Sequence, residues 1–296
     1  MASKFTYRTD LAVETQEILE KKEKLTGFTR KSRQLDEDIS VTAITIEDEE
    51  GERAFGKPRG TYITVEVKGI LEQKDKIADR AAHALAAELK QLIPFHYYLK
   101  ALVVGLGNEK VTPDSLGPHT VDKVKITSHL FKIYDCDGDW EMGNVSGFNP
   151  SVTGVTGMET AEVIEKVVQL VKPEVVIIID SLAAKDIRRI STTIQVCDTG
   201  ISPGAGMGNR RKEISENTLG CRVISIGVPT VIDSRTLILD AAEGIAPWNE
   251  KEVERYLSSR ELDMIVTSTD IDQIIQDFSQ IIADAINITL HPGIYS

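Results

Sequence analysis

Cysteine and aromatic residues are scarce in this sequence, and their scarcity excludes several classes of protein. The 296 residues include three cysteines and two tryptophans, and aromatic residues make up 5% of the chain. Because Cys136, Cys197 and Cys221 lie far apart and show no paired spacing, neither a disulfide framework nor a zinc knuckle is expected. We expect reduced thiols, as in a cytoplasmic protein.

Long apolar stretches are also absent. No apolar run approaches the length needed to cross a membrane, and residues 1–4 do not lead into the apolar segment of a signal peptide. We therefore expect a cytoplasmic protein without a membrane partner.

Positive charge is in short supply. Lysine and arginine total 34 against 46 aspartates and glutamates, which gives a formal net charge of -12 at pH 7. Direct binding to nucleic acid needs clustered cations that contact phosphates, and this balance argues against it. It is compatible with a soluble enzyme, including one that cleaves a basic or nucleic-acid-associated protein. A hydrophobic content of 41% is ample for a core.

Most short motifs that would reveal a mechanism are missing. The five histidines show no H-E-x-x-H spacing, and neither a Gly-x-Ser-x-Gly elbow nor a recognisable cysteine nucleophile occurs. The turn at Gly105 and Gly107 suggests a dinucleotide fingerprint, but Lys110 stands where its third glycine would fall. The glycine-rich residues 200–208 lack the Gly-Lys-Ser/Thr ending of a P-loop. Nucleotide binding is therefore weakly supported.

Strand and helix patterns alternate along the chain. Apolar, β-branched runs at 101–105 and 175–179 are typical of strands buried on both faces of a parallel sheet. Amphipathic helices are predicted at 75–93, 159–171 and 270–288. The alternation predicts an α/β fold, a three-layer sandwich with a mostly parallel central sheet. The other expected elements are helices at 15–25, 120–124 and 250–257, strands at 41–46, 62–67, 130–134, 193–196, 222–227 and 264–267, and loops at 47–57 and 135–157.

Two aspartates follow buried strands in this scheme. Asp180 directly follows the run at 175–179, and Asp114 follows 101–105 after one loop. If the two strands are neighbours, both carboxylates meet at the carboxyl edge of the sheet, where ligands bind in open α/β sheets. Two close carboxylates cannot both ionise readily, so one keeps a proton and the pair can act as acid and base. The alternative is that Asp180 caps a helix and Asp114 lies in a turn.

Three long motifs carry a family resemblance. They are GLGN and VTPDSLGP within 105–118, IDSLA at 179–183, and DTGI, PGAG and GN within 198–209. They resemble the spore germination protease family of endospore-forming bacteria, and the similarity extends from residue 8 to the end of the chain.

This resemblance implies an activity, a mode of synthesis, an assembly and a location for the chain. It implies an endopeptidase that degrades small acid-soluble, DNA-protecting spore proteins during germination. It also implies sporulation-stage synthesis as a self-cleaving zymogen, assembly as a homotetramer, and a cytoplasmic location in the forespore or spore core. Members of the family are regarded as atypical aspartic proteases, and their two essential aspartates fall on Asp114 and Asp180.

The first motif is also similar to that of the hydrogenase-maturation endopeptidases. In those enzymes Gly-x-Gly-Asn precedes an acidic residue at a comparable interval, so this resemblance implies their phosphorylase/hydrolase-like fold. No counterpart of their histidine can be assigned here, and no metal or other cofactor is carried over.

The N-terminal segment resembles the sites that the family cleaves. Those substrates are cut after Glu and before Phe or Ile, then Ala, a small residue and Glu. Residues 10–14, Asp-Leu-Ala-Val-Glu, follow a similar order, and we predict self-cleavage between Asp10 and Leu11. Residues 1–10 would then be a pro-segment and 11–296 a single peptidase domain. Asp in place of Glu and Val in place of a small polar residue make this a poorer site, suited to a delayed step.

Acidic residues around the cleaved bond need cations to bind them. Arg188, Arg189, Arg210 and Arg211 border the expected cleft, and an arginine can pair with a carboxylate through two hydrogen bonds. The alternative is that all four are ordinary surface charges.

Two other functions stay open on sequence grounds. One is a metal-assisted hydrolase that uses the same carboxylates with His119 or His129. The other is a non-catalytic nucleotide-binding regulator, which would explain the glycines but not the substrate-like N-terminus.

Overall fold

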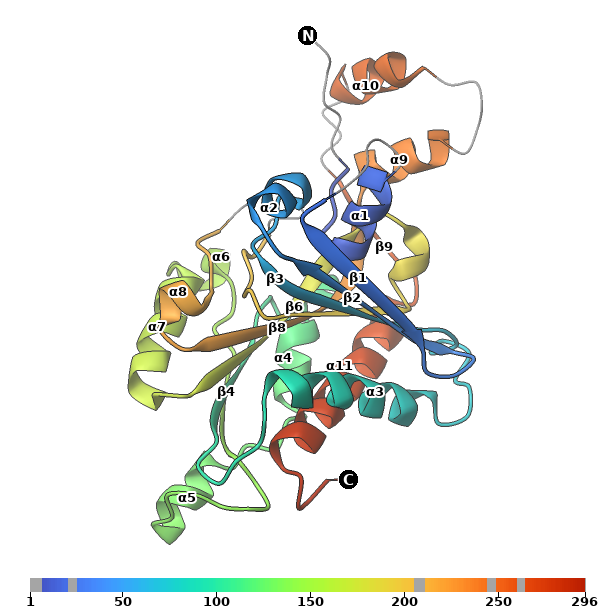
Figure 1. Ribbon diagram of the computed structural model, residues 1–296. Helices are drawn as coiled ribbons and strands as arrows, with labels where there is room; N and C mark the ends of the chain where they lie inside the picture. Colours follow the sequence, from blue (N-terminus) through green and yellow to red (C-terminus); the bar gives the residue numbers. More distant parts are fainter. Residues whose placement is uncertain (1–6, 21–25, 205–210, 244–248, 260–263, 296) are drawn as a thin grey trace.

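The computed structural model describes residues 7–20, 26–204, 211–243, 249–259 and 264–295. Within these residues a single sheet runs in the order β1-β2-β3-β7-β8-β6-β4-β5, and β9 pairs with β8 (Figure 1). The strands are β1 (Phe28–Gln34), β2 (Ile39–Ile46), β3 (Gly60–Val67), β4 (Lys100–Gly105), β5 (Asn144–Phe148), β6 (Val175–Ala184), β7 (Thr193–Cys197), β8 (Arg222–Asp233) and β9 (Ile265–Thr267).

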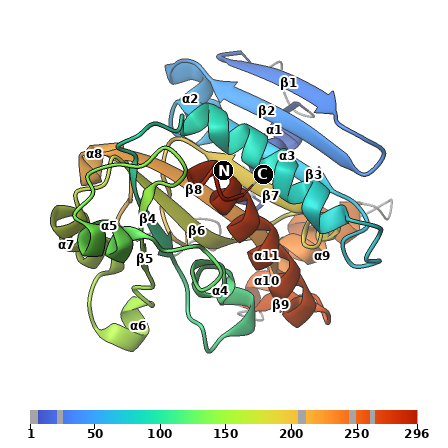
Figure 2. The same cartoon turned by 90° about the horizontal axis from the view of Figure 1, so that it is seen from below.

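Helices cover the sheet on both faces. They are α1 (Ala12–Glu20), α2 (Glu49–Phe55), α3 (Ile77–Leu92), α4 (Leu116–Val121), α5 (Ser128–Tyr134), α6 (Thr153–Thr156), α7 (Thr160–Val171), α8 (Glu216–Leu219), α9 (Ser234–Glu243), α10 (Glu250–Ser259) and α11 (Ile271–Leu290), with short 3-10 turns η1 (Thr112–Asp114) and η2 (Ile187–Arg189). Helices α3 and α11 lie against each other beneath the sheet (Figure 2).

The central strands are parallel, as the sequence predicted. Strand β6 pairs in parallel with β4 on one side and β8 on the other, and β5 adds to β4 in parallel. The flank formed by β1, β2, β3 and β7 is antiparallel. The α/β class is therefore confirmed, and the complete sheet is mixed because this flank pairs in the antiparallel sense and β7 joins β8 in the same way.

Strand β6 shows why the sheet is buried on both faces. Its Ile177 and Ile179 join the large core that includes α3 and α11, whereas Val176 and Ile178 join the smaller core beneath α7. Because successive strand residues point to opposite faces, a continuous apolar run supplies both cores at once.

Four local predictions were wrong. Residues 49–55 form α2 rather than a loop, because Asp48 accepts hydrogen bonds from the backbone N–H groups of Glu50 and Gly51 and so caps a helix start. Residues 128–134 form α5 rather than a strand, and the expected loop 135–157 contains β5 and α6. Strand β6 continues beyond Asp180 to Ala184, since β8 pairs with it along that whole length.

Most other elements match the sequence expectations within a few residues, although β8 continues to Asp233 past its expected end at 227. The expected helix at 15–25 begins earlier, at Ala12, and its last residues, 21–25, fall outside the described part of the chain. Strand β1 and helices α8 and α9 were not predicted. Strand β1 is exposed and polar at nearly every position, so it gives no apolar period. None of the described helices combines the length and apolar character of a membrane span.

Candidate active site

Asp114 is positioned by a tight turn after β4. Its Oδ2 and its backbone carbonyl both accept a hydrogen bond from the N–H of Asn108, at 2.9 and 3.0 Å. Gly107 makes this approach possible, because a Cβ there would lie 1.9 Å from the Asp114 carbonyl oxygen and its φ is +111°. Burial raises the pKa of the Asp114 carboxyl, and the Asn108 N–H lowers it by a smaller amount.

Asp180 lies within β6, next to the end of β4. Its residue is 8% exposed, and its Oδ1 accepts a hydrogen bond from the N–H of Ser181 at 2.9 Å. Burial raises the pKa of this carboxyl well above its ordinary value, and the negative charges of Asp114 and Asp10 raise it further. The carboxyl groups are therefore electrostatically coupled.

The two aspartates share one cavity. Because β4 and β6 are parallel neighbours, with Gly105 opposite Ile179, the turn that follows β4 brings Asp114 to the wall that Asp180 lines. The cavity has a volume of about 480 Å³ and is also lined by Gly107, Thr230 and Arg211. The expectation that the two strands are adjacent is thus correct. Asp180 lies within a strand rather than at a helix start, whereas Asp114 does lie in a turn, on the wall of this cavity.

The predicted cleavage segment is docked against β6, the strand that carries Asp180. Asp10 lines a second cavity, separate from the one that Asp114 and Asp180 line. The N–H of Asp10 donates to the Ala183 carbonyl and the Ala183 N–H donates to Asp10 Oδ2, both at 2.9 Å. The carbonyl oxygen of Asp10 accepts hydrogen bonds from Lys57 Nζ and Gln195 Nε2 at 2.8 and 3.1 Å. Leu11, which follows, is fully buried.

Glu14 anchors the same segment at its other end. Its carboxylate accepts hydrogen bonds from the Lys185 and Asp186 N–H groups at 2.6 and 2.8 Å and from the Thr9 hydroxyl. Arg189 Nε lies 3.5 Å from it. Burial raises the pKa of Glu14 despite these partners. The stretch from residue 9 to residue 14 is therefore held at both ends by the β6–η2 segment.

Comparison with known proteins identifies the family. A model of the germination protease family matches residues 7–255 of the chain. The chain belongs to the germination protease family. The germination protease of Caldanaerobacter subterraneus subsp. tengcongensis is 40% identical over 97% of this chain and 95% of that protein. The germination protease of Clostridium perfringens strain ATCC 13124 is 39% identical over 98% and 96%.

Membership in the germination protease family makes this chain a protease, as the motifs at 105–118, 179–183 and 198–209 had indicated. Among solved structures, the [NiFe] hydrogenase maturation protease HycI of Thermococcus kodakarensis matches 67% of this chain and 99% of its own, with 12% identity and a TM-score of 0.35.

The four arginines predicted to bind acidic substrates have different surroundings. Arg211 lines the cavity of Asp114 and Asp180. Arg188 is exposed and pairs with Asp186. Arg189 is 12% exposed and pairs with Glu14, Glu17 and Glu66. Arg210 lies outside the described residues.

The histidines considered as metal ligands do not join the aspartates. Neither His119 nor His129 lines the cavity, and His129 is exposed. Across the described ranges, no three His, Cys, Asp or Glu side chains are grouped closely enough to hold a metal ion.

Three features of the site gave no recognisable sequence signal. Lys57 and Gln195 contact the Asp10 carbonyl from segments far away in the chain, and neither lies in a motif. Thr230 Oγ1 donates to the Pro113 carbonyl at 2.7 Å and so ties the Asp114 turn to β8. Only the three-dimensional structure brings these side chains to the site.

Proposed function

We propose that this protease begins the degradation of small acid-soluble, DNA-protecting spore proteins during germination. It would be made as a zymogen in the forespore cytoplasm, and it would cut itself between Asp10 and Leu11. Residues 1–10 would be the pro-segment, residues 11–296 a single peptidase domain, and the working form a homotetramer. Family membership over nearly the whole chain supports the substrate class.

The observation that carries the self-processing proposal is the position of Asp10. Its charge raises the pKa of Asp180, and its backbone pairs with Ala183, three residues further along β6. A cleavage site elsewhere on the molecule would produce neither effect. The contact of Asp10 with β6 and its charge effect on Asp180 support cleavage of this segment by the carboxyl pair.

The carboxyl pair suggests how water is activated. Asp180 has the stronger upward pKa shift and is the partner that keeps a proton more readily, while Asp114 is the more readily ionised partner. Asp114 would accept a proton from water as the water attacks the peptide carbonyl, and Asp180 would protonate the departing nitrogen. Substrates with acidic residues would be bound by Arg211 at the cavity, with Arg188, Arg189 and Arg210 as further candidates.

Self-cleavage of the purified full-length chain tests the proposal. Incubation should yield a new N-terminus at Leu11, and Asp114→Asn and Asp180→Asn should each abolish it while keeping a cooperative unfolding transition. An Asp122→Asn variant, altered at an exposed position, is the control and should be cut normally. Processing by either active-site variant at the wild-type rate would contradict the aspartic mechanism, and loss of wild-type processing in a chelator would favour the metal-assisted alternative.

A further inference from the structure

The peptide group between Asp10 and Leu11 is hydrogen-bonded on every side. Its oxygen accepts from Lys57 Nζ and Gln195 Nε2, and its N–H donates to Thr9 Oγ1 at 3.0 Å. Gln195 also accepts, through Oε1, a 2.8 Å hydrogen bond from the N–H of Ala12. One glutamine side chain therefore spans the predicted bond and fixes the backbone before and after it.

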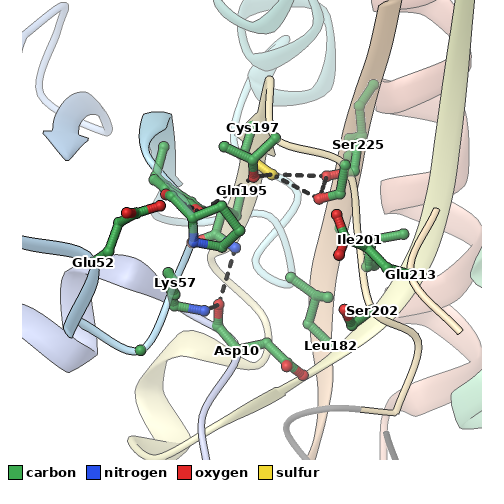
Figure 3. Close-up of a pocket in the computed structure, with 17 residues that line it drawn as sticks. Asp10, Glu52, Lys57, Leu182, Gln195, Cys197, Ile201, Ser202, Glu213 and Ser225 are labelled. Atoms are coloured by element: carbon green, nitrogen blue, oxygen red, sulfur yellow. Dashed lines mark hydrogen bonds between the residues drawn. The ribbon is translucent and has the colours of Figure 1, made fainter. Parts of the chain in front are cut away.

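Lys57 is held in place by its own surroundings. Helix α2 ends at Phe55, the C-cap residue Gly56 adopts φ +62°, and Lys57 follows directly. The Tyr62 hydroxyl donates to the Pro58 carbonyl at 2.9 Å, and the Lys57 ammonium lies 5.9 Å from the centre of the Tyr62 ring. From this position the ammonium donates a 2.8 Å hydrogen bond to the Asp10 carbonyl oxygen (Figure 3).

Gln195 reaches the same oxygen from a different element. It lies in β7 and is 7% exposed. With Asp10 and Lys57 it lines the second cavity, not the one lined by Asp114 and Asp180. Figure 3 shows Lys57 and Gln195 meeting at Asp10 from two directions. Two donors at 2.8 and 3.1 Å from one carbonyl oxygen match the spacing of donors that stabilise the oxyanion in acyl-transfer enzymes.

We propose that Lys57 and Gln195 are catalytic residues of self-cleavage, whose Nζ and Nε2 stabilise the oxyanion that forms on the Asp10 carbonyl. The proposal rests on the self-processing function given above. When water adds to the Asp10 carbonyl carbon, the C=O double bond becomes a C–O single bond and its oxygen becomes negatively charged. The water proton passes to the ionised carboxylate of the Asp114–Asp180 pair.

In the second half of the reaction the negative charge on the Asp10 oxygen is lost. As the C=O bond reforms, the C–N bond to Leu11 breaks, and its nitrogen takes a proton from the protonated carboxyl of the pair. The products are a carboxyl group on Asp10 and an amine on Leu11. A positively charged donor at the oxygen stabilises the transition state more than the neutral starting amide, because charge develops there only during the reaction.

The kinetic test compares full-length variants by the rate at which the Leu11 N-terminus appears. Lys57→Met should slow that step by about 100-fold or more, the typical effect of losing one oxyanion donor, and Lys57→Arg should recover part of the rate. Gln195→Met tests the second donor. Arg59→Met is the matched control, since Arg59 lies on the same loop but pairs with Glu52, and it should cleave at the wild-type rate.

A spectroscopic measurement separates polarisation of the carbonyl from a merely structural role. Asp-Leu occurs once in the sequence, at positions 10 and 11, so carbonyl-¹³C aspartate with ¹⁵N leucine gives a single correlated NMR signal. In an uncleavable Asp114→Asn background, Lys57→Met should move the Asp10 carbonyl resonance upfield, because the oxygen loses a cationic donor. Arg59→Met should leave it in place.

The outcomes distinguish this proposal from the one on which it rests. If the wild-type chain yields no N-terminus at Leu11, self-processing at this bond is wrong and the lysine and glutamine roles fail with it. If the wild type is processed there and Lys57→Met matches its rate within about threefold, a small fraction of the effect expected for an oxyanion donor, only the oxyanion assignment is overturned.

Discussion

Asp10 and Ala183 exchange two hydrogen bonds of 2.9 Å, one through the Asp10 backbone N–H and one through its carboxylate. Asp10 therefore pairs with β6 past the point where the neighbouring strand β4 ends at Gly105. It joins the first residues of the chain to the strand that carries Asp180. The segment around Asp10 is therefore packed against the strand that carries Asp180.

The first prediction concerns Asp180 and pH. Its raised pKa means that the native state binds a proton over a pH range in which the unfolded chain has lost it, so this group's contribution to stability decreases as pH rises. Asp180→Asn removes the free-energy cost that the raised pKa imposes on the native state. That cost is about 1.4 kcal/mol for each unit by which the native pKa exceeds the unfolded pKa. Thermal unfolding should show the variant more stable than wild type at neutral pH.

The gain should shrink on acidification and vanish below about pH 4, where an unfolded aspartate is also protonated. Glu37→Gln, at an exposed turn, is the comparison and should show no such pH-dependent gain. An Asp180→Asn variant that is equally stabilised at acid and neutral pH would contradict the raised pKa of the buried Asp180 carboxyl.

The second prediction concerns Gly107. Gly107→Ala should displace Asp114, because its Cβ would lie 1.9 Å from the Asp114 carbonyl oxygen at a φ of +111°. We expect a loss of about 2–4 kcal/mol in the free energy of unfolding and loss of self-cleavage. Gly154→Ala is the control, since no atom lies within 4 Å of the added Cβ; denaturant unfolding should show it within about 1 kcal/mol of wild type.

The third prediction compares two glutamates that share Arg189. Glu14 is 1% exposed, whereas Glu17 is 45% exposed. Glu14→Ala leaves two buried backbone N–H groups and the Thr9 hydroxyl without their acceptor and removes one of the three carboxylates around Arg189, so the free energy of unfolding should fall by about 3 kcal/mol. Glu17→Ala should cost less than about 1 kcal/mol, as for exposed ion pairs. Equal losses in denaturant titrations would show that Glu14 is not an anchor.

The fourth prediction concerns the link between Thr230 and the Asp114 turn. Thr230→Val removes the 2.7 Å hydrogen bond to the Pro113 carbonyl and should cost about 1 kcal/mol of stability. Because the turn positions Asp114, self-cleavage should also slow by about tenfold or more. Thr289→Val breaks a hydrogen bond of equal length within α11, to the Ala285 carbonyl, and should lower stability without slowing cleavage.

The buried apolar patterns made the centre of the fold predictable. The runs at 101–105 and 175–179 must be covered on both faces, which places them side by side in a parallel sheet and brings Asp114 and Asp180 together. Local capping and edge effects were harder to predict. Asp48 caps helix α2 in a charged stretch, and β1 is nearly all exposed. Neither element has the periodic apolar residues from which a helix or strand is predicted.

The sequence by itself determined the family and the α/β class and predicted the pair of aspartates, because motifs and buried strand patterns are local properties of the chain. Only the tertiary structure decided what surrounds them. Lys57 and Gln195 contact Asp10 across 47 and 185 residues of sequence. The charge of Asp10 raises the pKa of Asp180 because the fold brings the two residues close, although they are far apart in the sequence. Contacts of this kind depend on how distant elements pack, which no short pattern encodes.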